Sequence, residues 1–262
     1  MNPINRKYIL AISISILFIA CNPESKKEET SSTTDSTSNV KTDTTSTAAT
    51  APKETIMDAV TAAPNLYKVL NDSAGIRILE ATYKPGDSSA LHSHPLNAVY
   101  VISPGTVQFT EKDGTKHMNE FKTGMTMIRA MDVHSVKNTG KNTLKVLLVE
   151  VNRSGETVAP DASTDATKVA PDLYKVKADS LGLRIVEATY KPGQSSKMHT
   201  HPANAVYVIS PGTVEFTGKD GTKNTAEFKT GMSMIRGEDN HSVKNTGKTT
   251  LKVLLVEVYR KM

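Results

Sequence analysis

Cysteine is almost absent from this sequence of 262 residues, and Cys21 is the only one. No disulfide framework can form within one chain, and no second thiol is left to act as a nucleophile. The sequence also lacks a glycine-rich phosphate loop that opens a helix and a Gly-x-Ser-x-Gly turn. These absences remove the most common nucleotide-binding and nucleophilic-hydrolase chemistries from consideration.

Runs of basic residues are missing as well. The 32 Lys and Arg residues and 27 Asp and Glu residues give a net charge of +5, without a basic stripe that alternates with aromatic residues. Proteins that bind nucleic acids normally carry such a stripe. We therefore expect no nucleic-acid partner, and the hydrophobic fraction of 37% fits a soluble globular fold.

The N-terminus has an apolar stretch at residues 8–20 that follows Arg6 and Lys7. It is too short to span a bilayer, which takes about 20 apolar residues, and the layout is typical of a secretory signal. The sequence FIAC at residues 18–21 resembles the lipobox of bacterial lipoproteins, in which the cysteine is acylated. We expect residues 1–20 to be a lipoprotein signal peptide and Cys21 to be lipidated. The resemblance implies an exported protein, lipid-anchored at the bacterial cell envelope and facing the periplasm or the surface. An ordinary cleaved signal is the alternative.

The tract that follows, to residue 64, consists mainly of Ser, Thr, Asp, Glu, Lys and Ala. It contains too few large apolar residues to bury the surface that folding requires. We therefore predict a disordered tether over residues 21–64.

The rest of the chain is an internal repeat. Leu66 aligns with Leu173, and at this constant offset the match continues without a gap to Arg153 and Arg260. A unit of roughly 90 residues can hold its own core. We predict domains at 65–153 and 172–262, joined by a polar linker at 154–171 that contains two prolines.

Each repeat contains short segments rich in Val, Ile, Thr, Tyr and Phe, separated by turn residues, which predicts strands. In the first repeat these segments are 76–83, 97–102, 106–110, 125–128 and 144–151. No segment of helical length shows an apolar period of 3.6 residues. The repeats are therefore predicted to be all-β, as sandwiches or barrels.

Histidines recur at equivalent positions of the two repeats. In a strand, residues i and i+2 share a face, so His92 and His94 can hold one metal ion, and His134 can complete the set. The alternative is that these histidines only satisfy backbone carbonyls. His117 is unmatched, since Asn224 takes its place. The predicted metal ligands are His92, His94, His134, His199, His201 and His241.

These residues and their spacing resemble the two motifs of the cupin family. The first motif is matched by Gly86, His92, His94 and Gly105, and by Gly193, His199, His201 and Gly212. The second motif is matched by Gly124, His134 and Asn138, and by Gly231, His241 and Asn245. The turns at residues 130–132 and 237–239 depart from the family pattern. The resemblance implies a bicupin, with two tandem small β-barrels of the jelly-roll type.

The position of the family's glutamate ligand is occupied by Ala98 and Ala205. A regular strand would place Ala98 on the inward face with His92 and His94, and Tyr100 next along it. We therefore predict that Ala98, Tyr100, Ala205 and Tyr207 line a substrate pocket. Asn97 or Glu80 is the alternative source of the missing oxygen ligand.

What remains resembles the three-histidine subset of cupins, some of which are iron dioxygenases. This implies a divalent transition metal in each domain, with Fe, Zn, Ni, Cu and Mn all compatible with imidazole ligands. The predicted function is binding of a small molecule near the metal, with oxygenase or isomerase activity. The alternative is a non-catalytic ligand-binding or scaffolding module at the envelope. No catalytic residue is assigned, and both enzymatic activity and association through barrel edges stay open.

Overall fold

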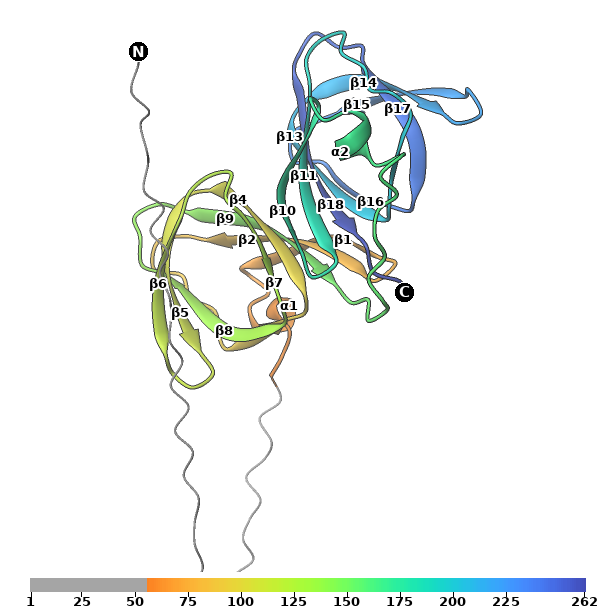
Figure 1. Ribbon diagram of the computed structural model, residues 1–262. Helices are drawn as coiled ribbons and strands as arrows, with labels where there is room; N and C mark the ends of the chain where they lie inside the picture. Colours follow the sequence, from red (N-terminus) through yellow and green to blue (C-terminus); the bar gives the residue numbers. More distant parts are fainter. Residues whose placement is uncertain (1–55) are drawn as a thin grey trace, which may run out of the picture. The chain divides into compact units, whose positions relative to one another are not determined.

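The computed structural model describes residues 56–262 (Figure 1). The predicted signal peptide, Cys21 and most of the predicted tether lie outside the described residues. Across residues 56–262, none of the helices combines the length and the apolar character needed to cross a membrane.

Within residues 56–262, each repeat folds into one short helix and nine strands. The first repeat contains α1 (Ala59–Ala62), β1 (Tyr67–Ser73), β2 (Ile76–Tyr83), β3 (His92–His94), β4 (Asn97–Ser103), β5 (Gly105–Glu111), β6 (Lys116–Phe121), β7 (Thr126–Arg129), β8 (Asp132–Asn138) and β9 (Leu144–Val151). The second contains α2 (Ala166–Val169), β10 (Tyr174–Ser180), β11 (Leu183–Tyr190), β12 (His199–His201), β13 (Asn204–Ser210), β14 (Gly212–Gly218), β15 (Lys223–Phe228), β16 (Ser233–Arg236), β17 (Asp239–Asn245) and β18 (Leu251–Val258).

The strands of each repeat form two antiparallel sheets that close into a barrel (Figure 1). In the first barrel the orders are β1-β2-β9-β4-β7 and β3-β8-β5-β6, and the second barrel repeats both orders. The predicted all-β fold of two tandem barrels is confirmed.

Strand patterning explains which face of each sheet is inside. Along β5, Gly105, Val107 and Phe109 are buried, and the residues between them are more exposed. This alternation is typical of a strand with one face in the core. The central strand β9 is buried along nearly its whole length, because both of its faces are covered.

Two motif residues of the sequence have structural roles. A Cβ added to Gly105 would lie 2.7 Å from Cβ of Leu144, so no larger residue fits there without a shift. The side-chain amide of Asn138 donates to the carbonyls of Tyr83 and Asn142, each at 2.8 Å. Asn138 thereby holds the end of β8, the strand that carries His134, and Gly105 allows close packing of β5 on the start of β9.

Each barrel has its own apolar interior, and a third apolar cluster is shared by both barrels. The shared cluster combines equivalent residues of the two repeats, such as Ile76 with Leu183 and Leu147 with Leu254. Strand β1 contacts β16, and β10 contacts β7 in the same way. The five-stranded sheets therefore bury one face inside their own barrel and the other against the neighbouring barrel.

The predicted boundaries are wrong at the start of each domain. Residues 56–64 were assigned to the tether, but they pack on the first barrel, with Ala59 and Ala63 buried. Asp58 caps the one-turn helix α1 by accepting from the backbone N–H of Val60 at 2.9 Å.

The predicted linker at 154–171 contains the equivalent segment, α2, which is capped by Asp165. These segments are held by small buried alanines and by the aspartate cap of a one-turn helix. Because alanine and polar residues also dominate a tether, composition alone does not distinguish the two.

Candidate metal centre

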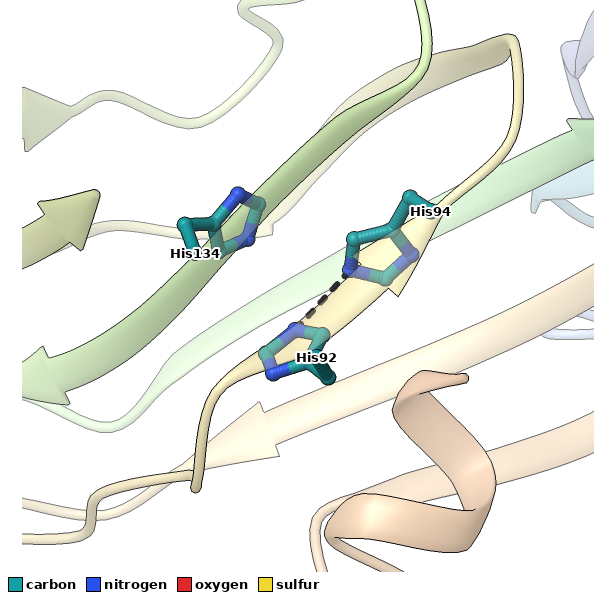
Figure 2. Close-up of side chains that lie close together, drawn as sticks. All are labelled: His92, His94 and His134. Carbon is teal, nitrogen blue, oxygen red and sulfur yellow. Dashed lines mark hydrogen bonds between the residues drawn. The ribbon is translucent and has the colours of Figure 1, made fainter. Parts of the chain in front are cut away.

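Strands β3 and β8 bring three imidazoles together inside the first barrel. The strands pair with His92 opposite His134, and residues that are directly opposite share a face. Figure 2 shows the three rings pointing toward one another from the two strands. One nitrogen from each ring lies within 4.8 Å of the others, and all three residues are buried. His199, His201 and His241 form the same group in the second barrel.

Acceptors on the far side of each ring determine which nitrogen carries the proton. Nδ1 of His92 donates to the carbonyl of Ala90 at 2.8 Å, and Nδ1 of His94 donates to Glu150 at 2.7 Å. Nδ1 of His134 lies 3.2 Å from Asp132, without hydrogen-bond geometry.

In the second barrel the same three contacts are 2.7, 2.7 and 2.8 Å, and His241 makes a full hydrogen bond to Asp239. Outer partners of this kind orient metal-binding histidines. The Nε2 lone pairs are therefore left facing the centre of the group.

These lone pairs have no common hydrogen-bond donor. Nε2 of His92 and Nε2 of His94 lie 3.1 Å apart, at the hydrogen-bond distance that the dashed line in Figure 2 marks, and this contact is a hydrogen bond only if one of the two nitrogens carries a proton. When both Nδ1 atoms carry the protons, these two nitrogens are both acceptors and repel each other. Burial lowers the pKa of His92 to about 4, and that of His199 to about 4, so neither is protonated at neutral pH. The donor set therefore fits a divalent transition metal, and each barrel has one such site.

A pair of buried tyrosines reaches the same centre, which sequence reasoning missed. The hydroxyl of Tyr67 lies 3.1 Å from Nε2 of His92, and it accepts from the hydroxyl of Tyr83 at 2.8 Å. Tyr174 and Tyr190 repeat the arrangement, with 2.9 Å to His199 and 2.6 Å between hydroxyls. Burial raises the pKa of Tyr67 and of Tyr174 well above the ordinary value, so both hydroxyls keep their protons.

Glu150 and Glu257 are the second missed pair. Each is fully buried in the last strand of its barrel, between a histidine and an arginine. Arg77 binds Glu150 at 2.6 Å, and Arg184 binds Glu257 at 2.6 Å. The signal was present in the sequence: one acidic residue follows a run of apolar residues in the segment LKVLLVEV, identically in both repeats. Arg77 and Arg184 hold these carboxylates rather than a ligand.

A small cavity of about 50 Å³ adjoins the histidines in each barrel. In the first barrel Phe109, Phe121 and Met127 line its apolar side, and Arg129 lines it in an ion pair with Asp132. Arg129 also stacks over the ring of Phe109, at 5.4 Å from its centre. The cavity is therefore mainly apolar, with a charged pair at one edge.

The predicted pocket residues Ala98, Tyr100, Ala205 and Tyr207 do not face this cavity. They belong to the apolar cluster shared by the two barrels. The prediction is wrong because His92–His94 and Asn97–Ser103 are strands of different sheets. The chain crosses between the sheets at residues 95–96, so the alternation of faces does not carry over.

Asn97 and Val99 line the cavity in place of Ala98 and Tyr100. The amide nitrogen of Asn97 donates to the carbonyl of Pro95 at 2.8 Å. Its oxygen is buried without a hydrogen-bond partner, as is the oxygen of Asn204. Glu80, the other alternative for an oxygen ligand, forms an ion pair with Lys145 at 3.1 Å. It does not line the cavity beside the histidines.

Comparisons with known proteins agree with this architecture. The family described as Cupin domain matches residues 186–257. No curated protein matches the chain. A solved structure described by the Mn(II) centres of Bacillus subtilis oxalate decarboxylase is similar at 16% identity, with a TM-score of 0.52 over 72% of this chain and 70% of that chain. A structure of a variant of the same enzyme gives 17% identity and a TM-score of 0.54, over 74% and 72% of the two chains.

At this identity the similarity to the solved structures shows a shared fold. The family match lies in the second barrel, and the first barrel repeats its strand order and its histidine group. The second barrel therefore matches the cupin domain, and the chain as a whole has a tandem double-cupin fold.

Proposed function

We propose that this protein is an envelope-anchored bicupin that binds one divalent metal in each barrel through His92, His94 and His134 and their equivalents. It holds a small molecule at the metal for oxygenase- or isomerase-type chemistry. The observation that carries the proposal is the set of inward Nε2 lone pairs, two of them 3.1 Å apart without a donor between them. The compatible metals are Fe, Zn, Ni, Cu and Mn; manganese is the metal named for the similar oxalate decarboxylase structure.

The chain's own residues have separate tasks at this site. Glu150 orients His94 from outside, and in the second barrel Glu257 and Asp239 orient His201 and His241 in the same way. The buried oxygen of Asn97 is the candidate oxygen donor in place of the family's glutamate. When His92 turns its lone pair to a metal, the hydroxyl of Tyr67 is free to donate to a bound small molecule. A bound metal supplies Lewis acidity, and a redox-active one also supplies electron transfer.

Metal content tests the proposal. The chain from residue 21 onward with Cys21→Ser is purified without chelator, reloaded with each candidate metal and analysed by elemental mass spectrometry. We expect two metal ions per chain. The variants His92→Ala/His94→Ala and His199→Ala/His201→Ala should each retain one. His117→Ala is the matched control, because this histidine lies outside both groups and should leave two ions. Metal at background level with every candidate would refute the proposal.

The anchoring part of the proposal rests on residues 1–21 of the sequence. The intact chain should partition with membranes and incorporate labelled fatty acid, and Cys21→Ser should lose both properties. Membrane partition that persists in Cys21→Ser would refute a lipid anchor on this residue.

A second candidate function is a non-catalytic binding module. The observation that favours it is the small size of the inner cavities, about 50 Å³ each, together with alanine at the family's glutamate position. In that case a ligand that binds the protein should bind equally well to the variant that combines His92→Ala/His94→Ala with His199→Ala/His201→Ala and holds no metal. Loss of ligand binding in that variant would favour the metal-dependent function.

A further inference from the structure

The two barrels differ at the mouth of the histidine centre. In the first barrel Glu111 lies directly opposite His134, and His117 lies directly opposite Phe109. Residues opposite each other in antiparallel strands share a face, as do residues i and i+2. Glu111 and His117 therefore project from the same face as His134, and Asn119 follows on that face.

The second barrel carries smaller or uncharged residues at these three places. Gly218 lies opposite His241, Asn224 lies opposite Phe216, and Ala226 follows on the same face. This exchange removes a carboxylate and an imidazole, which in the first barrel lie 4.0 Å apart. The unmatched seventh histidine of the sequence is therefore part of the rim of one centre only.

The smaller residues leave an open approach to the second centre. A groove of about 660 Å³ is lined by Gly218, Asn224 and Ala226 and reaches Arg236 and His241. Arg236 and His241 also line the inner cavity beside His201, so the groove and the cavity adjoin.

Residues at the mouth of the second centre are also more exposed to solvent than their equivalents in the first. Phe109 is buried, whereas Phe216 is only half-buried. The side chain of Asp132 is 19% exposed, and that of Asp239 is 33% exposed, although each makes the same ion pair with an arginine.

The character of the groove indicates what it would hold. Its walls include the apolar side chains Phe216, Phe228, Met232 and Met234. Among its charged lining residues Arg236 is paired with Asp239, which leaves the carboxylates of Asp220 and Glu227 and disfavours an anionic tail. A neutral ring-sized group fits these walls.

We infer that the second centre takes small molecules that combine a metal-binding head with a neutral apolar tail, the tail lying in this groove. The first centre takes only compact ligands, because Glu111, His117 and Asn119 occupy the corresponding place. Gly218, Asn224 and Ala226 are thus specificity-determining residues. This inference rests on the proposed metal site.

The test uses cobalt(II) as a spectroscopic probe in chains that keep one centre. His92→Ala/His94→Ala leaves the second centre, and His199→Ala/His201→Ala leaves the first. Each is titrated with imidazole and with 4-phenylimidazole, two neutral ligands that differ by one ring, and binding is followed by the visible cobalt spectrum. Imidazole should bind both centres similarly. Burial of the ring should make 4-phenylimidazole bind the second centre about tenfold or more tightly than the first.

Exchange of the rim residues supplies the decisive control. Gly218→Glu/Asn224→His/Ala226→Asn should remove the preference of the second centre, and Glu111→Gly/His117→Asn/Asn119→Ala should create it in the first. Glu215→Gln is the matched control, because this residue differs from Gln108 of the first barrel but points outward, and it should change nothing. Unchanged imidazole binding shows that each variant centre is intact.

Two failures are distinguishable. Equal preference at both centres, or a preference that survives the rim exchange, would overturn this inference while the metal site stands. Cobalt content at background in both one-centre chains would overturn the proposed metal site, and this inference with it.

Discussion

The two barrels have the same centre but different surroundings. All three histidines, the buried glutamate, the tyrosine pair and the cavity asparagine occupy equivalent places in both. The barrels differ, among other places, at the rim of the mouth and around the arginine behind the glutamate. The comparison separates the residues that fix the geometry of the histidine centre from two other groups. One group controls how ligands reach the centre, and the other forms the charge network behind the buried glutamate.

The arginine behind the glutamate shows the difference in support most clearly. Arg77 has a side chain that is 18% exposed, and its second carboxylate neighbour, Asp58, is 3.8 Å away. Arg184 is 5% exposed and binds Asp165 at 2.7 Å as well as Glu257. It also hydrogen-bonds and stacks on Tyr259, where the first barrel has Asn152. The second centre is therefore backed by a more buried charge network.

The largest expected effect follows from this network. Glu257→Ala leaves the buried Arg184 with one carboxylate fewer, and breaking such a buried pair costs about 3–5 kcal/mol. Glu150→Ala should cost less, about 2 kcal/mol, because water can reach Arg77. Denaturant unfolding of the metal-free protein measures both.

Glu80→Ala is the control for this comparison, since Glu80 makes a partly exposed pair with Lys145, and it should change stability by at most about 1 kcal/mol. Equal losses for Glu150→Ala and Glu257→Ala would contradict the difference between the barrels.

Acid should lower the free energy of unfolding of the metal-free protein through His92 and its equivalent, His199. The pKa of His92 and that of His199 are about 4 in the folded protein, below the ordinary value near 6.5. Between these pH values the unfolded chain binds more protons, so the free energy of unfolding falls as the pH falls from 6.5 to 4. The full effect is about 3 kcal/mol for each histidine.

Unfolding curves at several pH values check this expectation. His92→Gln should reduce the dependence between pH 6.5 and 5, and His92→Gln/His199→Gln should reduce it further. Part of the dependence should remain, because burial also lowers the pKa of His241. A dependence that is unchanged in the double variant would place its origin elsewhere.

The tyrosine pair offers a smaller test of the shared centre. Tyr67→Phe removes the hydroxyl that contacts Nε2 of His92 and accepts from Tyr83, so the metal-free protein should lose about 1 kcal/mol of stability. The same change removes a competitor for the lone pair, and metal affinity of that barrel should rise about fivefold. Tyr174→Phe should behave alike, because the contact is equivalent. Weaker metal binding in both variants would instead make the hydroxyl a supporting contact of the bound state.

The smallest expected effect on stability comes from a hydrogen bond between the two barrels. The amide of Asn71 donates to the hydroxyl of Ser233 at 2.7 Å, whereas the equivalent of Asn71 is Ala178. Asn71→Ala should therefore lower the free energy of unfolding by about 1 kcal/mol or less. Ala178→Ser, at the equivalent place, should cause a smaller change. A loss of several kcal/mol from Asn71→Ala would mean that this contact organises the whole interface.

The fold and the histidine groups could be predicted from the sequence, because each informative pattern occurs in both repeats. The histidine spacing, the turn glycines and the strand segments all occur twice, and the fold and the histidine groups follow from them. The sequence cannot show where a chain passes from one sheet to the other. Pro95 and Leu96 make that crossing, and the faces assigned to Ala98 and Tyr100 were wrong for this reason.

Other residues were hidden by their surroundings. Glu150 stands in an apolar strand segment, and only the packing of β9 beside β2 and β4 reveals that it links Arg77 to His94. Tyr67 lies far from His92 in the sequence, and pairing of β1 with β2 carries its hydroxyl to the centre. These contacts depend on the tertiary fold, which no local pattern encodes.

The apolar cluster shared by the barrels makes the chain resemble a dimer with both subunits on one polypeptide. In a dimer of separate chains, folding stability depends on protein concentration. Here the partner is always present at the high effective concentration set by a short connection. The described residues 56–262 lie in one compact unit, so this pairing should persist at any dilution. A covalent pair also frees each half to change alone, as the unequal mouths of the two centres illustrate.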